Sequence, residues 1–357
     1  MTVEFCHGLA ALEDLKAAWN SLHADVDPAF PFLDHQWIFT WARHYDADSD
    51  IIIGVAHENG RLIGAMPLRR CGGDLEFLGD PNCADYMDAL YSPDREEVLE
   101  EIAVAVIRQV PFRRWRLGRL VQRGTTAACL ASLYARQGIP FREFWICANP
   151  VLELPDSAET LLAAVPKPLR RDVRATERAL ENLGGARFCE YDSGREAEAI
   201  ADALARFHLD RQADKKGKSI FANERDLAFY TRVLPSVGSA IGLRASSIEA
   251  NGKIISASLS LVRGKTLFYW IPSFDASIPK VSLGKFHIFK LIEAAIKEGI
   301  RRFDFMIGDE RYKHQWTRNG YDCSELVAYR SSSSRALDIV KYSVRRRVRR
   351  VLEVLRG

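Results

Sequence analysis

The chain has 357 residues, of which 47% are hydrophobic and 27% are charged, so it can bury a sizeable core and is not intrinsically disordered. At roughly 100–200 residues per domain, this length predicts about two domains. Lysine and arginine total 50 and aspartate and glutamate total 47, for a net charge of +3. The whole-chain charge therefore gives no reason to expect a nucleic acid or an acidic substrate as partner.

Cysteine usage and the N-terminus exclude several protein classes. The seven cysteines are irregularly spaced and form no CxxC motif, which argues against a disulfide framework and a structural zinc site. No HExxH or EF-hand pattern occurs, and we expect no metal cofactor. The first residues lack a basic segment followed by an apolar one, and no run reaches the roughly 18 apolar residues of a membrane span. We expect a cytoplasmic protein.

The first half of the chain alternates helical and β-rich patterns. Leu99, Ile102 and Val106 recur at steps of three and four and give the helix over 94–108 an apolar face. The predicted elements are helices over 9–22 and 35–45, a hairpin over 51–69, strands over 74–79 and 86–91, and then the helix over 94–108, a strand over 115–117 and a helix over 125–137.

The second half begins with helices. A basic helix is predicted over 167–183, where Gly184-Gly185 provides a C-terminal stop signal. Helices over 195–213 and 224–234, strands over 241–249, 253–262 and 266–273, a helix over 284–298 and a strand over 302–307 follow. Helices followed by a three-strand meander, a helix and another strand make a mixed α/β domain.

A weak internal repeat links the two halves. Residues 59–65 read NGRLIGA and residues 251–257 read NGKIISA, each after a β-rich run. Asn-Gly favours a type I′ hairpin because both residues accept a positive φ. The repeat predicts a duplicated domain, with domains over 1–155 and 156–330; two unrelated hairpins are the alternative.

Five stretches, in this order and spacing, resemble a known family. They are Pro31-Phe32 with Trp37 and Trp41, Phe77-Leu78-Gly79 with Asp85, Tyr86 and Asp88, and residues 169–174 (LRRDVR), 282–285 (SLGK) and 303–313 (FDFMIGDERYK). The chain resembles the GNAT-like acyltransferases associated with bacterial cellulose and exopolysaccharide biosynthesis, which are related to Fem-type aminoacyltransferases. The resemblance implies two tandem GNAT-like domains of mixed α/β fold, an acyl-CoA donor, in the first place acetyl-CoA, and an amine or hydroxyl acceptor.

The resemblance places the donor site in the loop over 275–284. In GNAT enzymes the corresponding loop binds the CoA pyrophosphate, because a helix start has unpaired N–H donors and a partial positive charge. The expected cofactor-binding residues are Lys280, Ser282, Leu283, Gly284 and Lys285: Ser282 as N-cap, Gly284 for close approach, and the lysines for charge. An ordinary loop followed by a capped helix is the alternative.

The catalytic candidates follow the strand that contains Asp304. By the resemblance, Tyr312 would protonate the leaving thiolate and Lys313 would stabilise a phosphate or a developing oxyanion. Asp304, Asp309 or Glu310 could act as base toward the acceptor. A solvated acidic turn is the alternative for the acids.

Substrate-binding candidates come from both halves. Arg170, Arg171 and Arg174 form a basic stripe near a helix start, where an anionic ligand could bridge them, with Arg170 and Arg174 as the expected substrate-binding residues; pairing with nearby acids is the alternative. Trp37, Asp85 and Tyr86 would line a cleft between the halves. His208 lies in a segment that resembles one of the family, although a structural role is the alternative.

Two other functions stay open. A Fem-like transferase would take its donor group from an aminoacyl-tRNA and would bind in a strongly salt-dependent way. A non-catalytic module of envelope-polysaccharide assembly would have lost the donor site. A saccharide or small-molecule acceptor is expected for the enzyme, and nucleic acid only for the Fem-like alternative.

Charge is concentrated at the C-terminus. Residues 335–357 contain eight Lys/Arg and two acidic residues, a net charge of +6, which leaves −3 for the remaining residues. Apolar residues recur there at steps of three or four, so the segment over 331–357 predicts a serine linker and a basic amphipathic helix. Such a helix suits an anionic inner-membrane surface, and packing against the body is the alternative.

Overall fold

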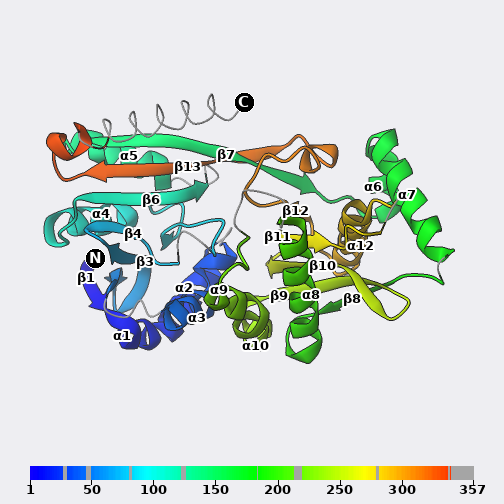
Figure 1. The fold of residues 1–357 in the computed structure, drawn as a ribbon. Coiled ribbons are helices and arrows are strands. Elements are labelled where there is room, and N and C mark those ends of the chain that lie inside the picture. The colour runs from blue at the N-terminus through cyan, green and yellow to red at the C-terminus, as the bar shows by residue number, and fades with distance from the viewer. Residues whose placement is uncertain are drawn as a thin grey trace, which may run out of the picture. The chain divides into compact units, whose positions relative to one another are not determined.

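The structure is a computed structural model that describes residues 1–26, 30–45, 50–79, 83–121, 126–182, 184–212, 219–278, 281–336 and 338. The chain divides into two compact units (Figure 1). Unit 1 consists of Met1–Pro28, Asp46–Ile146 and Cys323–Gly357, and unit 2 consists of Ala29–Tyr45 and Cys147–Asp322. These bounds differ from the predicted domains because residues 29–45 pack in unit 2 and the chain after residue 322 returns to unit 1.

Unit 1 is a mixed sheet with helices. Its strand order is β1 (Thr2–His7), β2 (Ile51–Glu58), β3 (Arg61–Cys71), β4 (Asp74–Phe77), β6 (Arg114–Val121) and β13 (Gly320–Tyr329), with β5 (Leu90–Tyr91) beside β3. The helices are α1 (Gly8–Asp14), α2 (Lys16–Asp25), α4 (Glu96–Gln109) and α5 (Thr126–Arg136). Neighbouring strands are antiparallel except for β4 and β6, which are parallel.

The hairpin of unit 1 forms as its sequence predicts. Asn59 and Gly60 have φ values of 51° and 76°, which a type I′ turn requires. Helix α4 packs closely on the hairpin strands, because a Cβ at Gly64 would lie only 2.4 Å from Val98 Cγ1. Gly64 therefore sets how closely α4 approaches the sheet.

Unit 2 repeats this arrangement. Its strand order is β8 (Arg187–Tyr191), β9 (Leu243–Ala250), β10 (Lys253–Arg263), β11 (Thr266–Phe274), β12 (Arg302–Asp304) and β7 (Phe141–Glu153). The helices are α3 (His35–Tyr45), α6 (Ala158–Ala164), α7 (Lys167–Glu181), α8 (Gly194–Gln212), α9 (Glu224–Ala228), α10 (Leu234–Ser236), α11 (Gly238–Ile241) and α12 (Leu283–Lys297). As in unit 1, three antiparallel pairings precede one parallel pairing, here between β11 and β12.

Helix α12 and the β-strands of unit 2 enclose an apolar core. Leu169 and Val173 of α7 and Phe286 and Leu291 of α12 belong to one buried cluster with residues of β9–β12. A polar network crosses this core, since His287 of α12 hydrogen-bonds Ser246 (2.9 Å) and Ser256 (2.7 Å). Burial lowers the pKa of His287 to about 3, so its imidazole stays neutral and binds the strands.

The predicted fold class is confirmed: both units are mixed α/β and share one wiring. The sequence patterns do not predict β1, β7, β8, β13 or the short α6, and the predicted strand over 302–307 is longer than β12. That strand ends at Asp304 because Met306 takes a left-handed conformation with φ of 60°. Residues 339–357, most of the predicted basic helix, lie outside the described residues. In the part of the chain that is described, no helix is both long and apolar enough to cross a bilayer.

Candidate active site in unit 2

The candidate site begins where two parallel strands separate. β11 and β12 pair over only three positions, from Thr266↔Arg302 to Phe268↔Asp304. Beyond Asp304 the chain turns toward β7, since the Phe305 N–H donates to the Pro150 carbonyl at 2.9 Å. β11 continues to Phe274 without a strand partner on that edge among the described residues. Backbone donors and acceptors on this edge are therefore available to a ligand.

A β-bulge re-aims the strand at this point. On β10, Leu259 pairs with Ile271 and Ser260 pairs with Tyr269, so Trp270 is the extra residue of β11. A bulge bends the strand and leaves one residue outside the ladder, and bulges are frequent next to active sites. The Trp270 ring packs against Phe32 and Trp37, with centroids 5.6 and 5.3 Å away. The separated edge thus has a rigid aromatic support.

Tyr312 and its neighbours supply the titratable groups. Burial, together with the nearby Glu310 carboxylate, raises the pKa of the Tyr312 hydroxyl above its ordinary value, against the opposing effect of Arg211. Burial likewise raises the pKa of Tyr269 on β11, and Tyr312 adds to the shift. Both phenols are therefore protonated at neutral pH. The Tyr312 hydroxyl makes no hydrogen bond within the described residues, so it can donate to a ligand.

Arg211 is the cation of this cluster. It lies in the last turn of α8, and its guanidinium carbon is 4.6 Å from the centroid of the Phe274 ring. Across the residues that the structure describes, no carboxylate pairs with it. Sequence patterns predict neither Arg211 nor Tyr269 as a site residue. Arg211 stands beside His208 in no motif of its own, and a tyrosine within an apolar strand looks like an ordinary core residue.

Lys313 is buried and committed to the chain itself. Its side chain is 4% exposed, and Nζ donates to the carbonyl of Ile307 at 2.8 Å and to those of Met306 and Gly308 at 3.4 Å. Nζ also pairs with Glu310 Oε2 at 2.9 Å. These partners use the donors of the ammonium group. Lys313 therefore holds the turn that precedes Tyr312, and in this structure its ammonium is not directed to a substrate.

Asp304 stabilises the same turn through its carboxylate. It is fully buried; Oδ1 accepts from the Met306 N–H at 2.8 Å, and Oδ2 accepts from the Tyr321 hydroxyl. The bond to the Met306 N–H helps to hold the left-handed conformation of that residue. Asp309 pairs with His314. Among the acids expected as base, Glu310 is 56% exposed and lies near Tyr312, whereas Asp304 is enclosed and Asp309 is bound to His314.

The expected donor loop lies against α7. The Ser282 N–H donates to Thr176 Oγ1 at 2.9 Å, and Lys285 Nζ pairs with Asp172 at 2.8 Å. Ser282 makes no side-chain cap, and Leu283 is buried. A Cβ at Gly284 would lie 3.2 Å from the Phe274 ring, so this glycine permits close packing on β11. Lys280 lies outside the described residues.

Helix α7 presents a basic face. Lys167, Arg170, Arg174 and Arg178 follow one another at helical spacing, and the described ion pairs give none of them a carboxylate partner. Only Arg171 of this helix pairs with Asp172, at 3.4 Å. The alternative that nearby acids neutralise the stripe therefore holds for Arg171 alone among the described contacts.

The remaining expected residues have packing partners. His208 Nδ1 hydrogen-bonds Ser219 Oγ at 2.8 Å. Trp37 is 1% exposed and packs in the aromatic cluster of unit 2, so it offers no surface to a substrate. Asp85 and Tyr86 belong to unit 1, where Asp85 pairs with Arg119 at 3.3 Å and Tyr86 is fully buried. Within unit 2 the structure thus brings Asp304, Tyr312, Lys313 and the donor loop into one neighbourhood of β11 and β12.

Comparison with known proteins agrees with this geometry. A family profile described as an acetyltransferase (GNAT) domain matches residues 167–314. No curated protein matches the chain.

Among solved structures, that of FemX has a TM-score of 0.62 and 9% identity, covering 89% of this chain and 96% of that one. The C-terminal domain of a putative lysylphosphatidylglycerol synthetase from Agrobacterium fabrum has a TM-score of 0.57 and 12% identity, with coverages of 93% and 96%. A tandem GNAT protein from the clavulanic acid biosynthesis pathway has a TM-score of 0.51 and 12% identity, with coverages of 92% and 99%. Residues 167–314 therefore match the profile of a GNAT acetyltransferase domain, and the chain has a fold similar to that of a tandem GNAT protein.

Proposed function

We propose that unit 2 transfers an acyl group, acetyl in the simplest case, from acyl-CoA to an amine or hydroxyl acceptor. The acceptor attacks the thioester carbonyl, a C–N or C–O bond forms and the C–S bond breaks. The leaving thiolate takes the proton of the Tyr312 hydroxyl, and the acceptor gives its proton to Glu310 directly or through water. Tyr312 then recovers a proton from solvent and Glu310 releases the proton that it accepted, which restores both groups.

The observation that carries this proposal is the free edge of β11 next to Tyr312. Backbone N–H groups on a separated strand can stabilise the negative charge that develops on the thioester oxygen. The Tyr312 hydroxyl keeps its proton at neutral pH and has no hydrogen-bond partner among the described residues, so it can hydrogen-bond the leaving sulfur and donate its proton as the C–S bond breaks.

The test is Tyr312→Phe, assayed by release of free CoA thiol from acetyl-CoA over a panel of amine and hydroxyl acceptors. Loss of a general acid lowers the rate by about 10²–10⁴-fold, so kcat should fall by at least that lower figure while KM for acetyl-CoA stays within about twofold. Tyr191→Phe, a change on β8 of the same unit, is the control and should keep full activity. Full activity of Tyr312→Phe would contradict the proposed role.

A second donor is favoured by the contacts of α7. The N–H of Ser282 and the ammonium of Lys285 are already bound to Thr176 and Asp172, so a CoA pyrophosphate would have to displace them. An aminoacyl-tRNA donor would instead lay its phosphates along the basic face of α7. Binding of acyl-CoA and of aminoacyl-tRNA to the full chain, each measured over a salt series, separates the two donors.

Two sets of variants distinguish the two donors by their effect on binding. If acyl-CoA is the donor, Thr176→Val frees the Ser282 N–H and should tighten acyl-CoA binding. If aminoacyl-tRNA is the donor, Arg170→Ala with Arg174→Ala should weaken tRNA binding and reduce the slope of log K against log salt by about one per arginine. Arg187→Ala, an exposed arginine of β8 that pairs with Glu249, is the matched control.

The acceptor and the site of action are proposed from the sequence. We take the acceptor to be a saccharide or another small molecule of polysaccharide or cell-envelope synthesis, as the family resemblance implies. The basic segment over 335–357 would hold the protein at the inner membrane surface. The support for this placement is the net charge of +6 in that segment.

A further inference from the structure

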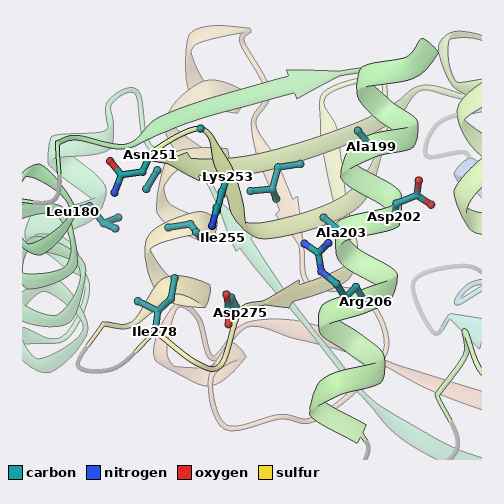
Figure 2. A pocket seen from close by; sticks show the side chains of 13 residues that line it. Leu180, Ala199, Asp202, Ala203, Arg206, Asn251, Lys253, Ile255, Asp275 and Ile278 are labelled. Carbon is teal, nitrogen blue, oxygen red and sulfur yellow. The ribbon is translucent and has the colours of Figure 1, made fainter.

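Unit 2 contains a cavity that the proposed reaction does not use. Its volume is about 790 Å³, within the roughly 300–1,000 Å³ of small-molecule sites. It is lined by the end of α7, by one face of α8, by the turn between β9 and β10, and by the segment after β11 (Figure 2). All of these elements belong to unit 2.

The cavity has an apolar part and two cations. Leu180, Ile255 and Ile278 contribute aliphatic side chains. The ammonium group of Lys253 and the guanidinium of Arg206 point into the space between α8 and the β9–β10 turn (Figure 2). Among the ion pairs of the described residues neither cation has a carboxylate partner. An ammonium and a guanidinium left without a carboxylate are a suitable pair for a phosphate group.

The acids of the lining are partly satisfied. Asp202 binds Arg232 through both oxygens, at 2.8 and 3.0 Å, and so does not neutralise the cavity. Asp275 Oδ1 accepts from the N–H and the hydroxyl of Ser277, at 2.9 and 2.6 Å. Once the Asp202–Arg232 pair is set aside, two cations face one carboxylate, and the lining keeps an excess of positive charge.

The backbone fixes the position of Lys253. Asn251 and Gly252 have φ values of 51° and 70°, so they form the type I′ turn, and Lys253 is the first residue of β10. Arg206 lies on α8, a helix of five turns that packs on β9, β10 and β11. Both charges are therefore attached to rigid elements, which limits the entropy lost when a ligand binds.

We infer that this cavity binds a small phosphate monoester with an apolar body, with the phosphate between Lys253 and Arg206 and the apolar body against Leu180, Ile255 and Ile278. The lining does not include Tyr312 or the expected donor residues 282–285, although it shares Asp275 and Ile278 with the loop that precedes α12. The Asp275 carboxylate is then available to accept a hydrogen bond from a hydroxyl of the ligand.

The probe is n-octyl phosphate, used below its critical micelle concentration and titrated into the full chain by calorimetry. The wild-type chain should bind one equivalent, and inorganic phosphate alone and octyl glucoside should each bind at least about tenfold more weakly, because each lacks one half of the interaction. Lys253→Gln and Arg206→Gln should each weaken octyl phosphate by at least about tenfold. Asp275→Asn should tighten it, because a nearby negative charge is removed.

Two further variants locate the site. Arg61→Gln is the matched control, since Arg61 follows the equivalent turn of unit 1 and pairs with Asp25; it should leave binding unchanged. Ala199→Trp places a large ring in the cavity from an exposed position and should abolish binding while the melting temperature stays near that of wild type.

Absence of octyl phosphate binding to the wild-type chain would overturn the inference. So would full binding to Lys253→Gln and Arg206→Gln, or equal affinity for inorganic phosphate and octyl phosphate. Tyr312→Phe should bind the probe as wild type does; a loss there would place the probe in the proposed active site instead.

Discussion

The two units of this protein share one order of strands and helices, but they differ in which strand edges and charged side chains have partners among the described residues. In each, an Asn-Gly hairpin is followed by a third strand, a helix and a parallel strand, and in each the parallel strand leads to a non-glycine residue with φ of 60°, Arg119 in unit 1 and Met306 in unit 2. In unit 1 the chain after β4 folds back, so that the Met87 N–H donates to the Arg119 carbonyl at 3.1 Å. In unit 2 β11 runs on, and its edge stays free among the described residues.

The hairpins differ in the same way. Arg61 of unit 1 pairs with Asp25, whereas Lys253 of unit 2 has no carboxylate partner among the described residues and lines a cavity. The comparison teaches that the same wiring can leave different groups available: among the described residues, unit 2 has a free strand edge at β11 and a lysine at its hairpin turn that has no carboxylate partner.

The largest expected effect tests whether residues 29–45 belong energetically to unit 2. Trp37→Ala should lower the free energy of unfolding by about 3–5 kcal/mol, because it empties a buried aromatic position. Trp19→Ala in α2 is the matched change in unit 1, where Trp19 is also fully buried. Hydrogen exchange should accelerate in β10 and β11 for the first variant and in β2 and β3 for the second. If either variant accelerated hydrogen exchange equally in both units, the assignment of residues 29–45 to unit 2 would be contradicted.

The next effect depends on pH and belongs to unit 1. Burial raises the pKa of Asp88 to about 7, despite hydrogen bonds from Thr126 and the Ala89 N–H that favour the charged form. Between about pH 4 and pH 7 the folded chain keeps this proton and the unfolded chain does not, so stability falls as pH rises through that range.

Asp88→Asn removes this ionisation. The variant should match wild type near pH 4 and be more stable at pH 8, by at most about 4 kcal/mol for a shift of about three units. Thermal melts at both pH values measure it. Glu190 of unit 2 also has its pKa raised to about 7 by burial, but Arg244 lies 3.3 Å away, so Glu190→Gln loses an ion pair and should gain less. An equal gain for Asp88→Asn at pH 4 and pH 8 would count against the titration.

The smallest effect concerns the two hairpins. Asn59 and Asn251 both have φ of 51°. Replacing either by Ala should lower the free energy of unfolding by about 1 kcal/mol, because alanine is strained in the left-handed region and its side chain cannot form a local hydrogen bond there. Replacement by Gly should be nearly neutral. Urea denaturation measures both pairs. A clear difference between Asn59→Ala and Asn251→Ala would show that the turns, alike in backbone, differ in surroundings.

Much of the architecture followed from local patterns. Amphipathic spacing located α4, α7, α8 and α12 to within a few residues, and the two Asn-Gly turns indicated the duplication, because turn chemistry and apolar periodicity act over a few neighbouring residues. The edge strands β1 and β8 and the strand β13 were missed, since their partners lie far away in sequence.

The candidate site was likewise predictable only in part from the sequence. The sequence pointed to the neighbourhood of Asp304, Tyr312 and Lys313, but only the tertiary structure showed their contacts. Asp304 and Lys313 are bound to the turn, and the Tyr312 hydroxyl has no hydrogen-bond partner among the described residues. It also decided that Thr176 and Asp172 of α7 bind the donor loop and that residues 29–45 pack in unit 2. Residue type and spacing determine which groups can react; which of them stay available depends on hydrogen bonds between segments far apart in the chain.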